Sequence, residues 1–180
     1  MPTQGQPKAD VKSLWRALAG VETGVVAGAV MLAYLMLDAM LRGVGVWSAV
    51  NLFASNFYGT AALGSTFRST TVAGLAWHFS LSGVLGLAIS PALWLFAQRP
   101  TRCALLGLVL AVSWYYGVVR LLWPQWNPLA GRYQPFPGLL FGHLIFGLAM
   151  GSYPKFVADL GEAATPVNAQ KPGCNAELEG

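Results

Sequence analysis

Four long apolar stretches constrain the fold of this chain more than any other feature. They cover residues 20–41, 71–97, 103–123 and 137–156. A hydrocarbon core of about 30 Å is crossed by roughly 20 residues of helix, and each stretch reaches that length. Only 10% of the chain is charged and 55% is hydrophobic, whereas a soluble domain is about 25% charged. The sequence therefore predicts an all-α integral membrane protein that folds as a four-helix bundle.

The basic residues predict how this bundle is oriented. Four of the eleven Lys and Arg fall at one end of the predicted spans, here called the outer end, and they are Arg42, Arg68, Arg120 and Arg132. The other seven fall at the opposite end: Lys8, Lys12, Arg16, Arg99, Arg102, Lys155 and Lys171. Because cytoplasmic flanks retain Lys and Arg, we expect a multi-pass protein of a bacterial inner membrane with both termini cytoplasmic. The net charge of +4 then reflects anionic lipid and gives no reason to expect a nucleic acid partner.

The remaining sequence divides into tails and connections. Residues 1–13 and 161–180 have the composition of flexible cytoplasmic tails, so the transmembrane domain is expected at 14–160. In the connection 42–69, apolar residues recur at helical spacing and polar residues fall on the opposite side; the two sets are Val46, Val50, Phe53, Phe57 and Ser48, Asn51, Ser55. This pattern predicts a short amphipathic helix in the outer membrane interface, between the first and second spans.

Two further features predict contacts between the spans. Gly20, Gly24 and Gly28 form a ridge on the first span, and such ridges let helix backbones approach closely in lipid. The ridge could serve packing within the chain or docking to another subunit, and packing within the chain is preferred. Asp38 and Arg120 lie near the outer ends of the first and third spans, where they are predicted to form a structural ion pair.

The two histidines of the chain each begin the same stripe of small residues. His78 is followed at helical spacing by Ser82 and Gly86, and His143 is followed by Gly147 and Gly151. Both histidines come six or seven residues after the start of spans that run in the same direction, so both are expected roughly 10 Å below the outer surface.

This arrangement has two interpretations. In the first, His78 and His143 are axial metal ligands of one haem b, with the four small residues leaving room for the macrocycle, or one of them binds a chlorophyll-type tetrapyrrole. In the second, each imidazole bonds to a neighbouring helix and the small residues pack, so that no cofactor is present. The second interpretation is preferred. Quinone or proton chemistry remains a third one.

Two short motifs carry a resemblance to known proteins. The segment from Gly142 to Gly151 has a His-Leu-x-aromatic-Gly pattern, and the glycine ridge is followed by Gly45, Trp47 and the pair Asn51 and Leu52. These motifs resemble those of mostly uncharacterised small bacterial four-helix membrane proteins. The resemblance implies a four-helix fold and implies no activity.

The expected function follows from what the sequence contains and lacks. There is no nucleophile beside a base, no phosphate-binding loop and no evident soluble substrate. We therefore expect a non-catalytic protein whose partners are the lipid bilayer and other membrane subunits. It would be an accessory or structural subunit of a respiratory or photosynthetic complex. The alternative is an electron-transfer subunit, either a bis-histidine cytochrome b or a quinone-interacting anchor.

Overall fold

A computed structural model describes residues 7–133 and 136–163, which form helices and short turns and contain no strand. The elements in chain order are α1 (Pro7–Leu41), α2 (Ser48–Tyr58), the 3-10 turn Gly59–Ala62, α3 (Ser69–Trp94), α4 (Pro100–Trp114), the π-helix Tyr115–Leu122, α5 (Trp123–Trp126), α6 (Pro128–Tyr133), α7 (Phe136–Ala149), the 3-10 turn Met150–Ser152 and α8 (Tyr153–Ala163). The all-α fold class is thus confirmed.

Four helical segments are long and apolar enough to cross a membrane: Ser13–Leu41, Ser69–Trp94, Pro100–Trp126 and Phe136–Gly161. Each contains most of one predicted stretch, so the prediction of four apolar helices is confirmed. α1 begins at Pro7, inside the stretch 1–13 that was predicted to be a tail, and α8 extends to Ala163. The rest of both predicted tails, residues 1–6 and 164–180, lies outside the described residues.

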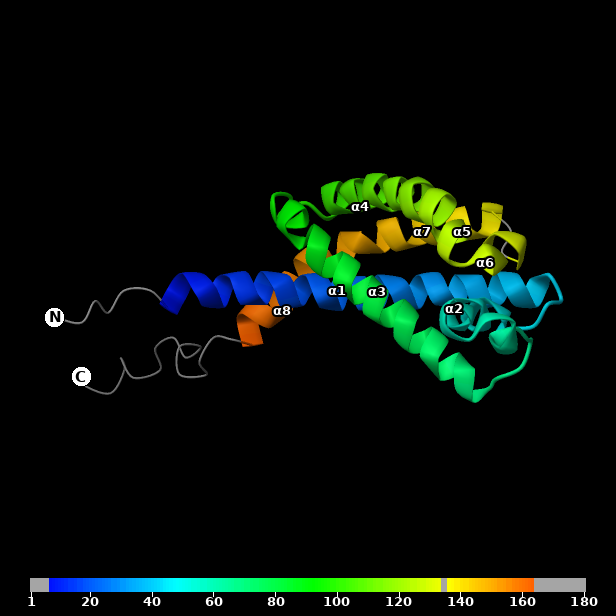
Figure 1. Cartoon of the computed structure of the whole chain (residues 1–180). Helices are drawn as coiled ribbons and strands as arrows, with labels where there is room; N and C mark the ends of the chain where they lie inside the picture. Colours follow the sequence, from blue (N-terminus) through cyan, green and yellow to red (C-terminus); the bar gives the residue numbers. More distant parts are fainter. Residues whose placement is uncertain (1–6, 134–135, 164–180) are drawn as a thin grey trace, which may run out of the picture.

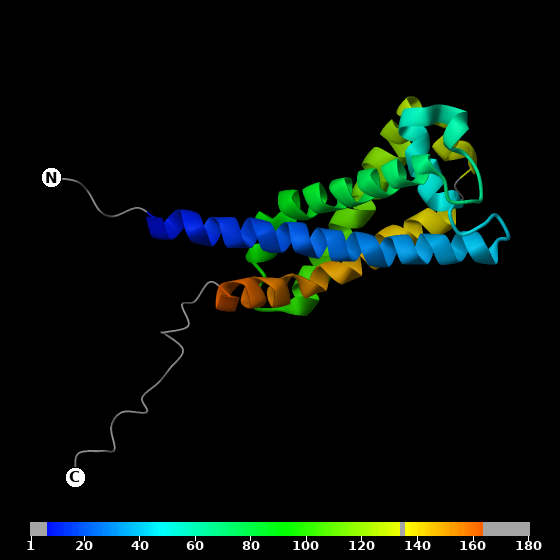
Figure 2. The same cartoon turned by 90° about the horizontal axis from the view of Figure 1, so that it is seen from below.

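α1 is the central helix of the molecule. It packs along most of α3 on one side and along α7 on another, and α4 packs mainly against α7. Figures 1 and 2 show that α3 crosses α1 obliquely. In Figure 1, α7 lies between α1 and α4. The histidine-bearing helices α3 and α7 are therefore both held by α1.

The short helices gather at one end of the molecule, which we call the cap end (Figures 1 and 2). α2, α5 and α6 lie there, where α1 ends and α3 begins. The start of α1 and the whole of α8 lie at the opposite end. The cap end corresponds to the outer end of the sequence prediction.

Glycine contacts between backbones fix how closely the long helices approach. A Cβ on Gly20 would stand 2.7 Å from the Gly86 carbonyl oxygen, and one on Gly24 would stand 2.9 Å from the Gly86 Cα. A second such contact joins α7 to α4, because a Cβ on Gly147 would lie 2.7 Å from the Leu108 Cα. The glycine ridge of α1 thus lies against α3 of the same chain, which brings the backbones into the close contact that stabilises helix pairs in lipid.

Polar residues of α2 are buried in the protein, and Val50 of the apolar set is buried beside them. Asn51 is fully buried and Ser55 is 5% exposed, whereas Phe57 from the apolar set is 57% exposed. The reason is that these polar groups find partners inside the cap. The Asn51 amide nitrogen donates to the carbonyls of Gly64 and Thr66 at 2.8 and 3.0 Å, and its oxygen accepts from the Thr71 hydroxyl at 2.6 Å.

A second set of hydrogen bonds joins the two cap connections to each other. The Asn127 amide donates to the Ser55 hydroxyl at 2.7 Å, and the Trp123 indole N–H donates to the Asn56 oxygen at 2.9 Å. Buried polar groups cost free energy unless they are hydrogen-bonded, so these bonds hold the cap in one arrangement.

Candidate functional site

His78 of α3 is buried and bonds to the central helix. Its ring is 7% exposed, and Nε2 lies 2.9 Å from the Gly28 carbonyl oxygen of α1. A carbonyl only accepts, so Nε2 carries the proton and Nδ1 is left as an acceptor. The imidazole also stacks on the Phe53 ring of α2, with centroids 5.0 Å apart and planes 20° from parallel. His78 therefore joins α3 to both α1 and α2.

His143 of α7 is equally buried but bonds within its own helix. Nδ1 donates to the Leu139 carbonyl oxygen one turn earlier, at 2.8 Å. Its ring meets the Tyr115 ring at 5.4 Å, and the Tyr115 hydroxyl donates to the Phe136 carbonyl at 3.1 Å. The Tyr115 side chain thus connects the start of the π-helix to α7 at the level of His143.

The small residues that follow each histidine face different helices. Ser82 and Gly86 lie against the glycine ridge of α1, where the Ser82 hydroxyl and the Gly86 Cα directly face it. Gly147 and Gly151 lie instead against α4: a Cβ on Gly151 would stand 3.2 Å from the Ala104 Cβ. The two stripes therefore do not face each other.

A shared tetrapyrrole does not fit this arrangement. It would need the small residues beside His78 and His143 to border an open slot wide enough for the macrocycle, whereas backbone atoms of α1 and α4 fill the space beside them. Separate hydrogen-bond partners for the two imidazoles are what the packing interpretation requires.

An aromatic column beside His78 was not recognised from the sequence. Phe53 stacks on His78 with one face, and its ring centroid lies 6.0 Å from that of Trp123, with planes 23° apart. The three rings come from α2, α3 and α5. Phe53 had been placed on the apolar face of an interfacial helix, and the helical spacing alone does not reveal what that face contacts.

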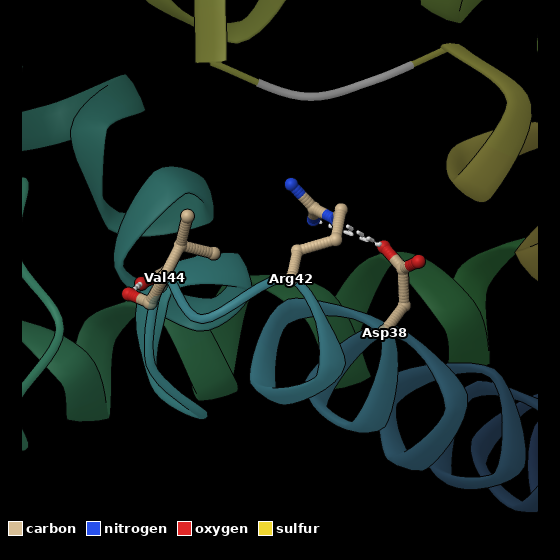
Figure 3. Close-up of polar contacts among 4 residues, drawn as sticks. Asp38, Arg42 and Val44 are labelled. Carbon is tan, nitrogen blue, oxygen red and sulfur yellow. Dashed lines mark hydrogen bonds and ion pairs between the residues drawn. The ribbon is translucent and has the colours of Figure 1, made fainter.

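Asp38 pairs with a neighbour on its own helix and not with Arg120. Its Oδ2 lies 2.9 Å from an Nη of Arg42, one turn later, and accepts from Arg42 Nε at 3.0 Å (Figure 3). The Arg120 guanidinium lies 3.5 Å above the Phe136 ring. The predicted ion pair is therefore replaced by two local contacts, an i,i+4 pair and a cation–π contact.

Comparison with known protein families, with curated proteins and with solved structures finds no match to this chain. In the structure the small residues Ser82, Gly86, Gly147 and Gly151 pack against neighbouring helices, and His78 and His143 bond to backbone carbonyls.

Proposed function

We propose that this chain is a small non-catalytic membrane protein, an accessory or structural subunit of a larger complex in a bacterial inner membrane. The observation that carries this proposal is which groups its most reactive side chains bond to. The groups best suited to chemistry, the two imidazoles, are bonded to backbone carbonyls inside the protein. Such an interior supports a scaffold, because it stabilises helix pairs and leaves the outward faces for partners.

The outward faces of α3 and α4 suit a protein that docks within the membrane. Val84 of α3 is 59% exposed and Val109 of α4 is 63% exposed. In the most apolar part of these two spans only 28% and 22% of the residues are buried inside the protein, whereas the corresponding shares in the first and fourth spans are 39% and 44%. Partner subunits of a respiratory or photosynthetic complex would cover part of these two faces, and lipid would cover the rest.

The placement of the helix ends supports the expected orientation. The start of α1 and the whole of α8 lie at the same end of the molecule (Figure 1). Lys155 and Arg16 belong to that end, as do the turn residues Arg99 and Arg102. This asymmetry agrees with both termini being cytoplasmic.

The test is purification from the native membrane in a mild detergent, followed by mass spectrometry of co-purifying proteins. We expect partners in stoichiometric amount. The variants Val84→Trp and Val109→Trp enlarge the exposed faces without touching the interior, so at least one should lose its partner while the isolated chain unfolds at the same temperature. A lone, monodisperse wild-type protein would contradict the proposal.

A further inference from the structure

The basic residues at the cap end are all arginines. Four arginines lie there, Arg42, Arg68, Arg120 and Arg132, and the lysines among the described residues, Lys8, Lys12 and Lys155, lie towards the other end. Asp38 is the only acidic residue between Glu22 and Asp159. The cap therefore has a net positive charge, carried by guanidinium groups, whose planar forks match phosphate and carboxylate oxygens.

A cavity of about 250 Å³ opens at this end, between the end of α1 and the cap. Polar and apolar side chains share its wall, including Arg42, Ser48, Ser65, Tyr133, Leu52 and Leu63. A wall of this kind suits a ligand that has both a charged group and a hydrocarbon part.

The wall of this cavity is held in place by the fold. Gly45 has a positive φ of 93°, and a Cβ there would stand 2.5 Å from the Ser65 Cβ, so the turn after α1 is pressed against the opposite loop. The buried Asn51 amide grips that loop through the carbonyls of Gly64 and Thr66. A wall fixed before binding lowers the ordering cost of taking up a ligand.

The Arg42 guanidinium is only partly used by Asp38. Nε and one Nη both contact the same carboxylate oxygen, and the third nitrogen points away from Asp38 (Figure 3). The Arg68 guanidinium lies against Gly64, a residue of the cavity wall, and its Nη1 contacts the Leu63 carbonyl oxygen. Asp38 thus pairs with Arg42, and no ion pair is formed by Arg68 among the described residues, which leaves an excess of positive charge near the cavity.

The depth of the site indicates which anion it would meet. Large aromatic side chains are exposed around the cap, among them Phe57, Phe67, Trp126 and Tyr133, each more than half exposed. Exposed aromatic rings at the end of membrane-spanning helices are typical of the headgroup layer. The anion that abounds at this depth is the phosphate of a phospholipid.

We propose that this cavity binds a phosphate group through Arg42. The phosphate would belong to an anionic phospholipid headgroup or would be a free phosphate ion. In either case its oxygens accept hydrogen bonds from the guanidinium edge turned away from Asp38. A lipid source would also place a hydrocarbon part against Leu52 and Leu63.

The full chain, delipidated in detergent, is titrated in separate arms with phosphatidylglycerol, phosphatidylcholine and inorganic phosphate, and bound ligand is counted by native mass spectrometry. We expect phosphatidylglycerol to bind more tightly than phosphatidylcholine. Arg42→Gln should weaken that binding about tenfold or more, since it removes charge-assisted hydrogen bonds. Val44→Trp should weaken it to a similar degree by narrowing the cavity, whose wall includes the 45%-exposed Val44.

Arg120→Gln is the matched control, since Arg120 sits at the same end but is committed to the Phe136 ring. It should leave binding within about twofold, because a single screened surface charge contributes little. Binding of inorganic phosphate that is equally sensitive to Arg42→Gln would identify a free-ion site, whereas binding of lipid alone would identify a headgroup site. Equal binding of both lipids, or binding unchanged in Arg42→Gln and Val44→Trp, would overturn the proposal. Circular dichroism of each variant checks that it is folded.

Discussion

Adding one methyl group at Gly86 tests whether the α1–α3 crossing holds the molecule together. A Cβ there would lie 2.8 Å from the Gly24 Cα and still closer to the Gly20 carbonyl oxygen. Two carbon atoms are at optimal separation near 3.5–4.0 Å, so the helices would have to move apart by roughly 1 Å. Both obstructing atoms belong to the backbone, and no rotamer change relieves the contact.

The expected net effect of Gly86→Ala is a loss of about 2 kcal/mol of stability. Overpacking costs up to roughly 3 kcal/mol, and the better helix propensity of alanine returns at most about 1 kcal/mol. The matched control is Gly83→Ala on the same helix. A Cβ on Gly83 would be 3.4 Å from Val25 Cγ2 and 3.5 Å from Val21 Cγ1, an ordinary contact. This control should be neutral or up to about 1 kcal/mol stabilising.

Both variants are measured by unfolding the purified protein with increasing SDS in mild detergent and following helix content by circular dichroism. The prediction is that Gly86→Ala is less stable than the wild type and that Gly83→Ala is not. Wild-type stability in Gly86→Ala, or an equal loss in Gly83→Ala, would show that the backbone contact at Gly86 does not set the distance between α1 and α3.

Two further predictions concern the other intramembrane contacts. His78→Leu should cost about 0.5–1.5 kcal/mol of stability in the same unfolding assay, since it removes a bond between helices, and His143→Leu should cost less because its bond stays within α7. The purified wild-type protein should show no haem absorption. A haem b band that is lost in both variants would refute the packing role. In double-mutant cycles, Asp38→Asn with Arg42→Gln should give a coupling energy of about 0.3–0.5 kcal/mol. Asp38→Asn with Arg120→Gln should give a coupling energy near zero, since Arg120 stacks on an aromatic ring. A larger coupling energy in the second cycle would support the ion pair expected from the sequence.

Hydropathy was sufficient to predict the four long helices, because a stretch of about 20 apolar residues has few other stable states in a bilayer. The type of helix within a span was less predictable. The third span does not end with its α-helix at Trp114 but continues as a π-helix from Tyr115 to Leu122. Widened turns of this kind depend on what the segment packs against, and here Tyr115 reaches the carbonyl of Phe136 on α7. The sequence around Tyr115 does not indicate that its side chain contacts Phe136.

The burial of polar residues on α2 has a physical cause that local sequence does not reveal. On a soluble protein, the polar side of an amphipathic helix faces water. At a membrane boundary a polar side chain can also turn inward when buried backbone carbonyls need donors. Asn51 does so, because the loop that contains Gly64 and Thr66 offers two such carbonyls. The spacing identified the helix, and only the tertiary partners determine which side is buried.

The histidine stripes illustrate the same limit at the level of helix pairing. Two stripes on parallel helices are compatible with a shared ligand only when those helices face each other. What prevents this here is α1, because its glycine ridge lies against the small residues that follow His78. Gly28 then places its carbonyl oxygen within reach of Nε2 and provides the imidazole with a bonding partner. A stripe of small residues beside a histidine therefore becomes evidence for a cofactor only after the glycine ridges elsewhere in the chain have been assigned their own contacts.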